Sequence, residues 1–255
     1  MVLTRLFKRR ESEPPTGAPR LPDNLRLYAV GDIHGCRERL QRLHAAIERD
    51  AAGFAGRKVI VYLGDYVDRG EDSAGVIEDL LRAEPAGFER IFLKGNHEDF
   101  LLRSLEDKGA LLPWLANGGD STCRAYGIEP TNPPDGTTDL LGWLQQRLRE
   151  ALPEGHLSFL RNLRLTHGEG DYLFVHAGVR PGIELDKQSE EDLLWMREPF
   201  LSSRQPLGKV VVHGHTPSAS PERRANRIGI DTGACYGGAL TALVLEGDDQ
   251  RFLQA

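Results

Sequence analysis

The sequence contains little cysteine: only Cys36, Cys123 and Cys235 occur among its 255 residues. These three are widely spaced and odd in number, and no Cys-x-x-Cys pair occurs, so the sequence indicates neither a disulfide framework nor a thiolate zinc site. Free thiols are typical of a reducing compartment, and we therefore predict a cytoplasmic protein.

Long hydrophobic runs and an excess of positive charge are also missing. No stretch approaches the roughly 20 apolar residues of a transmembrane helix, so we expect no membrane span. The chain carries 32 Lys and Arg against 38 Asp and Glu, a formal net charge of -6. That balance provides no basic field for a nucleic-acid partner. An acidic protein that handles phosphate must concentrate positive charge locally, through arginines or metal ions.

The composition, with 40% hydrophobic and 27% charged residues, is that of an ordinary globular protein of one sizeable domain. At the start, a short apolar stretch precedes Lys8-Arg9-Arg10 and several prolines. A secretory signal has the opposite order, so we expect none. We predict a flexible tail over residues 1–24, one domain over residues 25–255, and a helical insertion around residues 111–153.

A unit of strand, loop and helix occurs three times in the first half of the chain. Apolar runs at residues 25–30, 59–63 and 91–93 are each followed by apolar residues at helical spacing, which is the pattern of a βαβ sheet. Strand signals predominate in the second half, with a short helix over residues 190–196. The sequence therefore predicts a layered sheet protein with helices, α/β in its first half and richer in β structure afterwards.

Potential metal ligands lie just past the ends of five predicted strands. In open α/β sheets, ligands bind beyond the carboxyl ends of the strands. Singly, an Asp after a strand is a common turn residue and a lone His is usually structural. Five such strand ends together indicate a shared site. The residues are Asp32 and His34; Asp65, Asp68 and Arg69; Asn96 and His97; His176; and His213 and His215.

Oxygen and imidazole ligands without thiolates suit Mn, Fe, Zn or Mg rather than a structural zinc. The set is too large for one ion and sufficient for two, and Asp65 in the middle loop could bridge them. Water bound to such ions becomes a hydroxide nucleophile near neutral pH. Arg69 leaves the same loop, and its guanidinium can bind phosphate oxygens in a bidentate manner. A surface salt bridge is the alternative interpretation of Arg69.

Six motifs resemble those of the phosphoprotein phosphatase family of metallophosphoesterases, in its short bacterial and phage branch. They are Gly31-Asp32-Ile33-His34-Gly35, Gly64-Asp65-Tyr66-Val67-Asp68-Arg69-Gly70, Gly95-Asn96-His97-Glu98, His176-Ala177-Gly178, Trp195-Met196-Arg197 and Gly214-His215-Thr216. The resemblance covers roughly residues 27–245. It implies a metallophosphoesterase-type β-sandwich flanked by helices, with the catalytic domain over residues 25–255.

The resemblance also implies two sets of metal ligands that share one carboxylate. The first set is Asp32, His34 and Asp65. The second set is Asp65, Asn96, His176 and His215. The cofactors would be two divalent ions, with Mn²⁺ favoured and Fe, Zn or Mg as alternatives. His213 is not part of either set, and we interpret it as a structural residue at a strand end.

The remaining residues of the pattern would act on the substrate. By the resemblance, His97 would be the general acid that protonates the leaving alkoxide, with Asp68 as its carboxylate partner. Arg69 and Arg197, with Asn96, would bind the phosphoryl oxygens. Arg197 depends on the Trp-Met-Arg match alone, and an arginine on a helix surface is the alternative interpretation.

The resemblance favours a serine/threonine protein phosphatase that hydrolyses phosphoserine and phosphothreonine monoesters in proteins or peptides by direct attack of a metal-bridged hydroxide. One alternative is a symmetrical diadenosine-tetraphosphate hydrolase, but such enzymes usually lack an acidic residue at Asp68 and tend to have Asp in place of Glu98. Pro217 stands where many broader metallophosphoesterases have a second histidine. A non-catalytic phosphopeptide-binding module is the other alternative, and the unbroken ligand set speaks against it.

Overall fold

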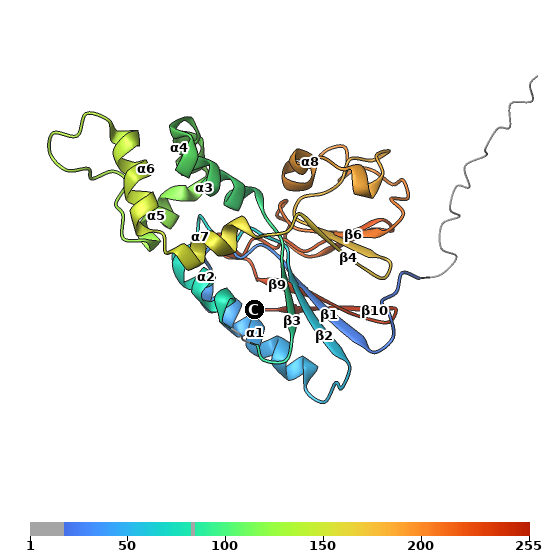
Figure 1. The fold of residues 1–255 in the computed structure, drawn as a ribbon. Coiled ribbons are helices and arrows are strands. Elements are labelled where there is room, and N and C mark those ends of the chain that lie inside the picture. Colours follow the sequence, from blue (N-terminus) through green and yellow to red (C-terminus); the bar gives the residue numbers. More distant parts are fainter. Residues whose placement is uncertain (1–17, 83–84) are drawn as a thin grey trace, which may run out of the picture.

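A computed structural model describes residues 18–82 and 85–255. Two five-stranded sheets pack against each other, and helices lie on the outer side of each sheet (Figure 1). The prediction of a layered β-sandwich flanked by helices is confirmed.

The first sheet has the strand order β10-β9-β1-β2-β3. Its strands are β1 (Leu25–Val30), β2 (Arg57–Tyr62), β3 (Glu89–Phe92), β9 (Thr241–Glu246) and β10 (Asp249–Gln254). The first three are parallel and correspond to the three predicted βα units, whereas β9 pairs antiparallel with β1 and β10 pairs antiparallel with β9. The parallel strands therefore deliver their following loops to the same edge of the sheet.

The second sheet has the order β4-β5-β6-β8-β7. Its strands are β4 (Thr166–Glu169), β5 (Tyr172–Val175), β6 (Val210–His213), β7 (Glu222–Arg223) and β8 (Arg227–Gly229). Strands β5, β6 and β8 are parallel. The loops after β5 and β6 carry the predicted ligands His176 and His215, so this sheet also presents its strand ends to the site.

Side chains alternate between the two faces of the first sheet, as the strand period of two requires. On β1, Leu27 and Ala29 pack into the core between the sheets, whereas Tyr28 and Val30 pack under the helices. Helices α1 (Arg37–Ala51), α2 (Ser73–Leu81) and α7 (Glu154–Arg161) cover that outer face, and α8 (Glu190–Trp195) covers the second sheet (Figure 1). None of the helices in the described ranges is long and apolar enough to cross a membrane.

The predicted insertion is largely helical. Beyond α3 (Asn96–Glu106), the chain forms α4 (Leu111–Trp114), the π-helical turn η2 (Leu115–Gly119), α5 (Asp120–Ala125) and α6 (Leu140–Ala151). Figure 1 shows these green to yellow helices grouped at one end of the molecule. Helix α3 begins at Asn96, so the Asn96-His97 pair occupies the first turn of a helix.

The last seven residues of the tail predicted over residues 1–24 belong to the folded domain. Residues 1–17 lie outside the described residues, but residues 18–24 pack on the domain. Leu21 is only 1% exposed and its backbone N–H donates to Gly247 O at 2.8 Å, while Tyr172 Oη donates to Pro19 O at 3.1 Å. Burial of the Leu21 side chain beside the first sheet extends the domain before Leu25.

Candidate metal centre and its acid–base pair

The site is built from strained backbone at the ends of parallel strands. Within residues 18–82 and 85–255, six non-glycine residues have a positive φ, and five of them are predicted site residues. These five are His34, Asp65, Asp68, Arg69 and His215. Non-glycine residues adopt this conformation rarely, and they tend to do so at functional sites.

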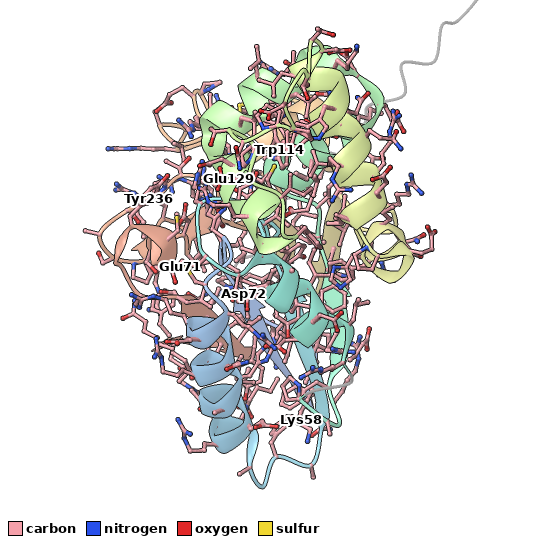
Figure 2. All side chains as sticks on the ribbon, turned by 90° about the vertical axis from the view of Figure 1, so that its left-hand side faces the viewer. Lys58, Glu71, Asp72, Trp114, Glu129 and Tyr236 are labelled. Atoms are coloured by element: carbon pink, nitrogen blue, oxygen red, sulfur yellow. The ribbon has the colours of Figure 1, made fainter. Side chains whose placement is uncertain are left out.

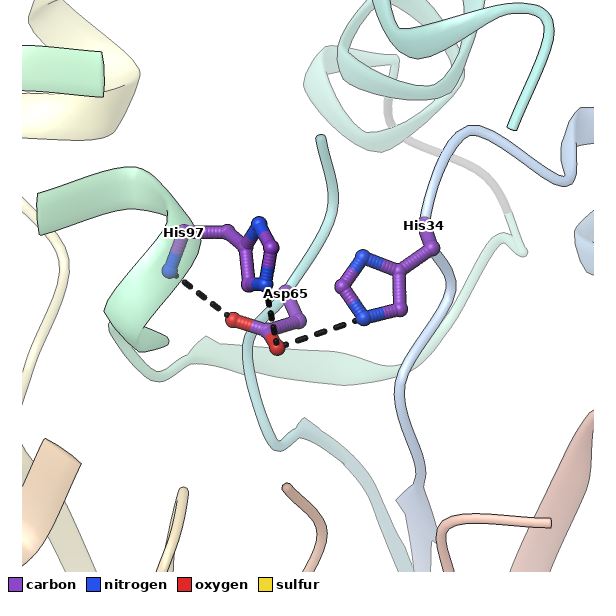
Figure 3. Close-up of side chains that lie close together, drawn as sticks. All are labelled: His34, Asp65 and His97. Atoms are coloured by element: carbon purple, nitrogen blue, oxygen red, sulfur yellow. Dashed lines mark hydrogen bonds and ion pairs between the residues drawn. The ribbon is translucent and has the colours of Figure 1, made fainter. Parts of the chain in front are cut away.

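Asp65 lies between two groups of histidines. On one side, its Oδ2 is 3.3 Å from His34 Nε2 and 3.9 Å from His97 Nε2 (Figure 3). The backbone N–H of His97 donates to Asp65 Oδ1 at 3.1 Å. All three residues are buried, and their ligand atoms lie close enough to hold a metal ion.

The second group lies on the other side of the same carboxylate. His176 Nε2 is 3.4 Å from Asp65 Oδ1 and 2.9 Å from Asn96 Oδ1, and His215 Nδ1 is 2.9 Å from the same Asn96 oxygen. Asp65, His176 and His215 form a second candidate metal group. The structure therefore brings members of both predicted ligand sets around the Asp65 carboxylate, with His34 on one side and Asn96, His176 and His215 on the other.

Asp32 lies in the loop after β1 and contacts the second of these groups. Its Oδ2 accepts the backbone N–H of His215 at 2.9 Å, whereas its buried Oδ1 has no hydrogen-bond partner among the described residues. Gly214 allows this approach, since a Cβ there would lie 1.9 Å from Asp32 Oδ1. Burial and the neighbouring carboxylates of Asp231 and Asp65 raise the pKa of Asp32 well above its usual range.

Backbone carbonyls fix the orientation of two imidazoles. His34 Nδ1 donates to Val67 O at 2.9 Å and His176 Nδ1 donates to Leu63 O at 3.0 Å, so Nε2 of each ring is the unprotonated nitrogen that carries the lone pair. Burial lowers the pKa of His34 and of His215 to about 3 and also lowers the pKa of His176. Neutral imidazole is the form that ligates metals.

The donor set fits divalent cations. The free lone pair of His176 Nε2 faces the oxygens of Asn96 and Asp65, and the unpartnered Asp32 Oδ1 lies in the same buried region. Such a convergence of acceptors is unfavourable without a positive charge between them. Carboxylate, amide and imidazole ligands without sulfur suit Mn, Fe, Zn or Mg. The residues present therefore fit metal ions at this position.

His97 and Asp68 form a buried pair beside the metal groups. His97 Nδ1 donates to Asp68 Oδ2 at 2.7 Å, and the two residues are 1% and 0% exposed. Burial, the largest influence, lowers the pKa of His97, but the carboxylates of Asp65 and Asp68 outweigh it and the net pKa is raised. The pair can therefore hold a proton on His97 Nε2, the atom that faces Asp65 Oδ2.

The two predicted arginines differ in burial and in their contacts with the site. Arg69 is half-buried, its Nη1 donates to His34 Nε2 at 2.7 Å, and its guanidinium lies 5.7 Å from the ring centre of the exposed Tyr236. Arg197 is exposed, and its charge contributes to the lowered pKa of His215. Its neighbour Trp195 packs edge-on against His215, with ring centres 6.1 Å apart. Arg197 is thus at the edge of the site and Arg69 is inside it.

His213 lies outside the two metal groups, in accordance with its interpretation as structural. Its ring is buried at 5.0 Å from that of Phe200, and its Nδ1 bonds to Gly214 O. His213 is the last residue of β6, and its side chain packs into the core of the second sheet rather than toward the site.

Sequence reasoning missed two carboxylates of the site. Asp231 lies beside Asp32, and burial raises its pKa to about 6. It follows Ile230 directly after β8, so the strand-end signal that selected the other ligands also applied to it. Buried Glu98 accepts backbone N–H groups from Asp65, Tyr66 and Gly95 at 2.7–2.9 Å, and thereby holds the loop that carries Asp65.

The chain is similar in sequence and in fold to known proteins. The calcineurin-like phosphoesterase family matches residues 25–239. Serine/threonine-protein phosphatase 1 of Salmonella typhimurium is 30% identical over 220 residues, covering 84% of this chain and 89% of the relative. A symmetrical bis(5'-nucleosyl)-tetraphosphatase of Acidovorax sp. is 34% identical over 203 residues, covering 77% of this chain but 59% of the relative. The structure of a cold-active protein tyrosine phosphatase superposes with a TM-score of 0.57 at 16% identity, covering 92% and 81%, a likeness of fold alone.

Proposed function

The chain belongs to the calcineurin-like phosphoesterase family, and from this premise we propose that it is a serine/threonine protein phosphatase. The observation that carries the proposal is the buried Asp68–His97 pair. A serine or threonine alkoxide is a poor leaving group unless it is protonated as the ester bond breaks, and an oriented imidazolium can supply that proton. Asp68 holds the His97 ring by a 2.7 Å hydrogen bond to Nδ1, which leaves Nε2 to face the reacting group.

The metal ions would be held by the two groups around Asp65. Asp32, His34 and Asp65 would bind one ion, and Asp65, Asn96, His176 and His215 would bind the other. When bound, divalent cations lower the pKa of water and neutralise charge on the phosphoryl group. We propose Mn²⁺ for both positions, with Fe, Zn and Mg as alternatives.

Arg69, Arg197 and Asn96 would bind the phosphoryl oxygens. Arg69 donates to His34 Nε2 in this structure. That nitrogen has one lone pair, so His34 can give it either to the guanidinium or to a metal ion. Metal binding at His34 would free the Arg69 guanidinium to bind phosphate, which guanidinium does in a bidentate manner.

A second candidate function is symmetrical hydrolysis of diadenosine tetraphosphate, because an Acidovorax tetraphosphatase is 34% identical to the chain. The leaving group in that reaction is a nucleoside diphosphate, a weakly basic phosphate that departs without protonation. A buried proton donor is therefore needed when the leaving group is an alkoxide, and it is dispensable when the leaving group is a nucleoside diphosphate. The pair of Asp68 and His97 supports the protein phosphatase.

A comparison of catalytic efficiencies tests this choice of substrate. With purified protein and Mn²⁺, we expect kcat/KM on a phosphothreonine peptide to exceed that on diadenosine tetraphosphate by at least about tenfold, equivalent to about 1.4 kcal/mol of transition-state binding. The measurement is release of phosphate from the peptide and of ADP from the dinucleotide under the same conditions. A higher efficiency on the dinucleotide would replace the proposed function by the second candidate.

A further inference from the structure

The carboxylate of Asp68 has three side-chain donors, and two of them come from the helical insertion. Oδ2 accepts His97 Nδ1 at 2.7 Å and Trp114 Nε1 at 2.9 Å, and Oδ1 accepts Thr122 Oγ1 at 2.7 Å. Trp114 is at the end of α4 and Thr122 is in α5. All four residues are at most 1% exposed, so water does not compete for these bonds. Hydrogen bonds to an ionised acceptor are among the stronger ones in proteins.

Thr122 also holds the backbone of the same aspartate. The N–H of Asp68 donates to Thr122 Oγ1 at 2.9 Å and to Ser73 Oγ at 3.1 Å, and the two hydroxyls lie 3.0 Å apart. Thr122 has one hydroxyl proton, and that proton goes to Asp68 Oδ1. Ser73 must therefore donate to Thr122, which orders the chain of bonds from Ser73 to Thr122 to the carboxylate. These contacts hold Asp68 at a φ of 72°.

The segment between Trp114 and Thr122 packs closely against the loop that carries Asp68 and Arg69. Gly118 O accepts the backbone N–H of Arg69 at 3.1 Å, and a Cβ at Gly118 would lie 2.7 Å from Arg69 Cγ. A Cβ at Gly119 would lie 2.4 Å from the Trp114 ring. Figure 2 shows Trp114 among the helices of the insertion. The insertion thus contacts the Asp68-Arg69 loop through its backbone as well as through the two donors.

We propose that Trp114 and Thr122 are positioning residues that fix the carboxylate of Asp68 toward His97 and thereby make the insertion part of the proton-donating machinery. This inference rests on the proposed function in one respect, the role of His97 as general acid. If either Trp114 or Thr122 loses its donor group, the Asp68 carboxylate can rotate away from His97 Nδ1, and the imidazole is no longer held in one orientation. The effect should appear only in reactions whose leaving group needs a proton.

Two aryl phosphates of different leaving-group basicity test this prediction. Phenolate leaves poorly without protonation, whereas p-nitrophenolate leaves readily. We expect Thr122→Val to lower kcat on phenyl phosphate by about tenfold or more, a part of the 10²- to 10⁴-fold that a positioned acid contributes. On p-nitrophenyl phosphate the loss should stay below about threefold, with KM and the Mn²⁺ content unchanged. Thr122→Ser keeps the hydroxyl and should retain the wild-type ratio of the two rates.

Equal losses on both esters, or a loss of bound Mn²⁺, would show that Thr122 has only a structural role and would overturn the inference. Trp114→Phe removes the other insertion donor to the Asp68 carboxylate, and we expect it to show the same selective loss on phenyl phosphate. This second variant tests the inference if the Thr122→Val protein does not fold. Neither ester contains a peptide. Wild-type protein that cleaves both esters but not a phosphothreonine peptide would therefore contradict the proposed function alone.

Discussion

Replacement of His97 by asparagine is expected to lower kcat on a phosphothreonine peptide by about 10²- to 10⁴-fold, the contribution of a positioned general acid. The amide protons of asparagine are not acidic enough to be transferred to the departing alkoxide. Asparagine is polar and smaller than the imidazole, so we expect the buried pocket beside Asp68 to accommodate it. The measurement is steady-state kinetics of phosphate release with saturating Mn²⁺. The loss on p-nitrophenyl phosphate should be much smaller, because p-nitrophenolate needs no proton.

The metal content of the variant distinguishes a general-acid role of His97 from a role as a metal ligand. His34, Asp65 and His97 could together hold an ion, with Asp65 Oδ2 3.9 Å from His97 Nε2. If His97 is the acid, His97→Asn should bind as much Mn²⁺ as the wild type. Loss of an ion from the variant would reassign His97 as a ligand, and full activity on the peptide would remove it from the mechanism.

Replacement of Asp65 by asparagine is expected to have the largest effect of any single substitution. Asp65 directs Oδ2 to the His34 side and Oδ1 to the His176 side, and an amide supplies one oxygen and no charge. Mn²⁺ bound per chain should fall below one ion, and kcat on every phosphate ester should fall by more than about 10³-fold, since both the nucleophile and the charge neutralisation depend on the ions. Elemental analysis of desalted protein, with kinetics on the same sample, measures both.

Asp79→Asn is the matched control for the loss of a largely buried carboxylate. Asp79 is on α2, accepts a hydrogen bond from Arg37 Nε at 2.8 Å, and lies outside both metal groups. That variant should keep its Mn²⁺ and its activity. Wild-type metal content in Asp65→Asn would show that this carboxylate does not bridge the ions.

The sequence predicted which strand-end residues lie close together better than it predicted which residues surround them. The ligands follow apolar strands, and parallel strands deliver their ends to one edge, so position along the chain was sufficient to group Asp32, Asp65 and Asn96. Asp231 follows the same rule after β8 and could have been predicted, but it does not occur in the motifs that carried the resemblance.

The contacts of Asp68 could not be predicted in this way. Thr122 is 54 positions away in the chain and Trp114 is 46, and neither carries a local pattern that specifies its partner. The packing of Leu21 was missed for the same reason, since its proline-rich surroundings are typical of a tail. Hydrophobic periodicity reports which face of an element is buried, whereas the partner depends on how distant segments meet.

Anomalous diffraction from crystals grown with Mn²⁺ tests most directly whether two ions share the carboxylate of Asp65. We predict two peaks about 3.5–4 Å apart, one on the His34 side of Asp65 and the other between His176 and His215. A single peak, or peaks that do not contact Asp65, would contradict the assignment of this site as a two-metal centre.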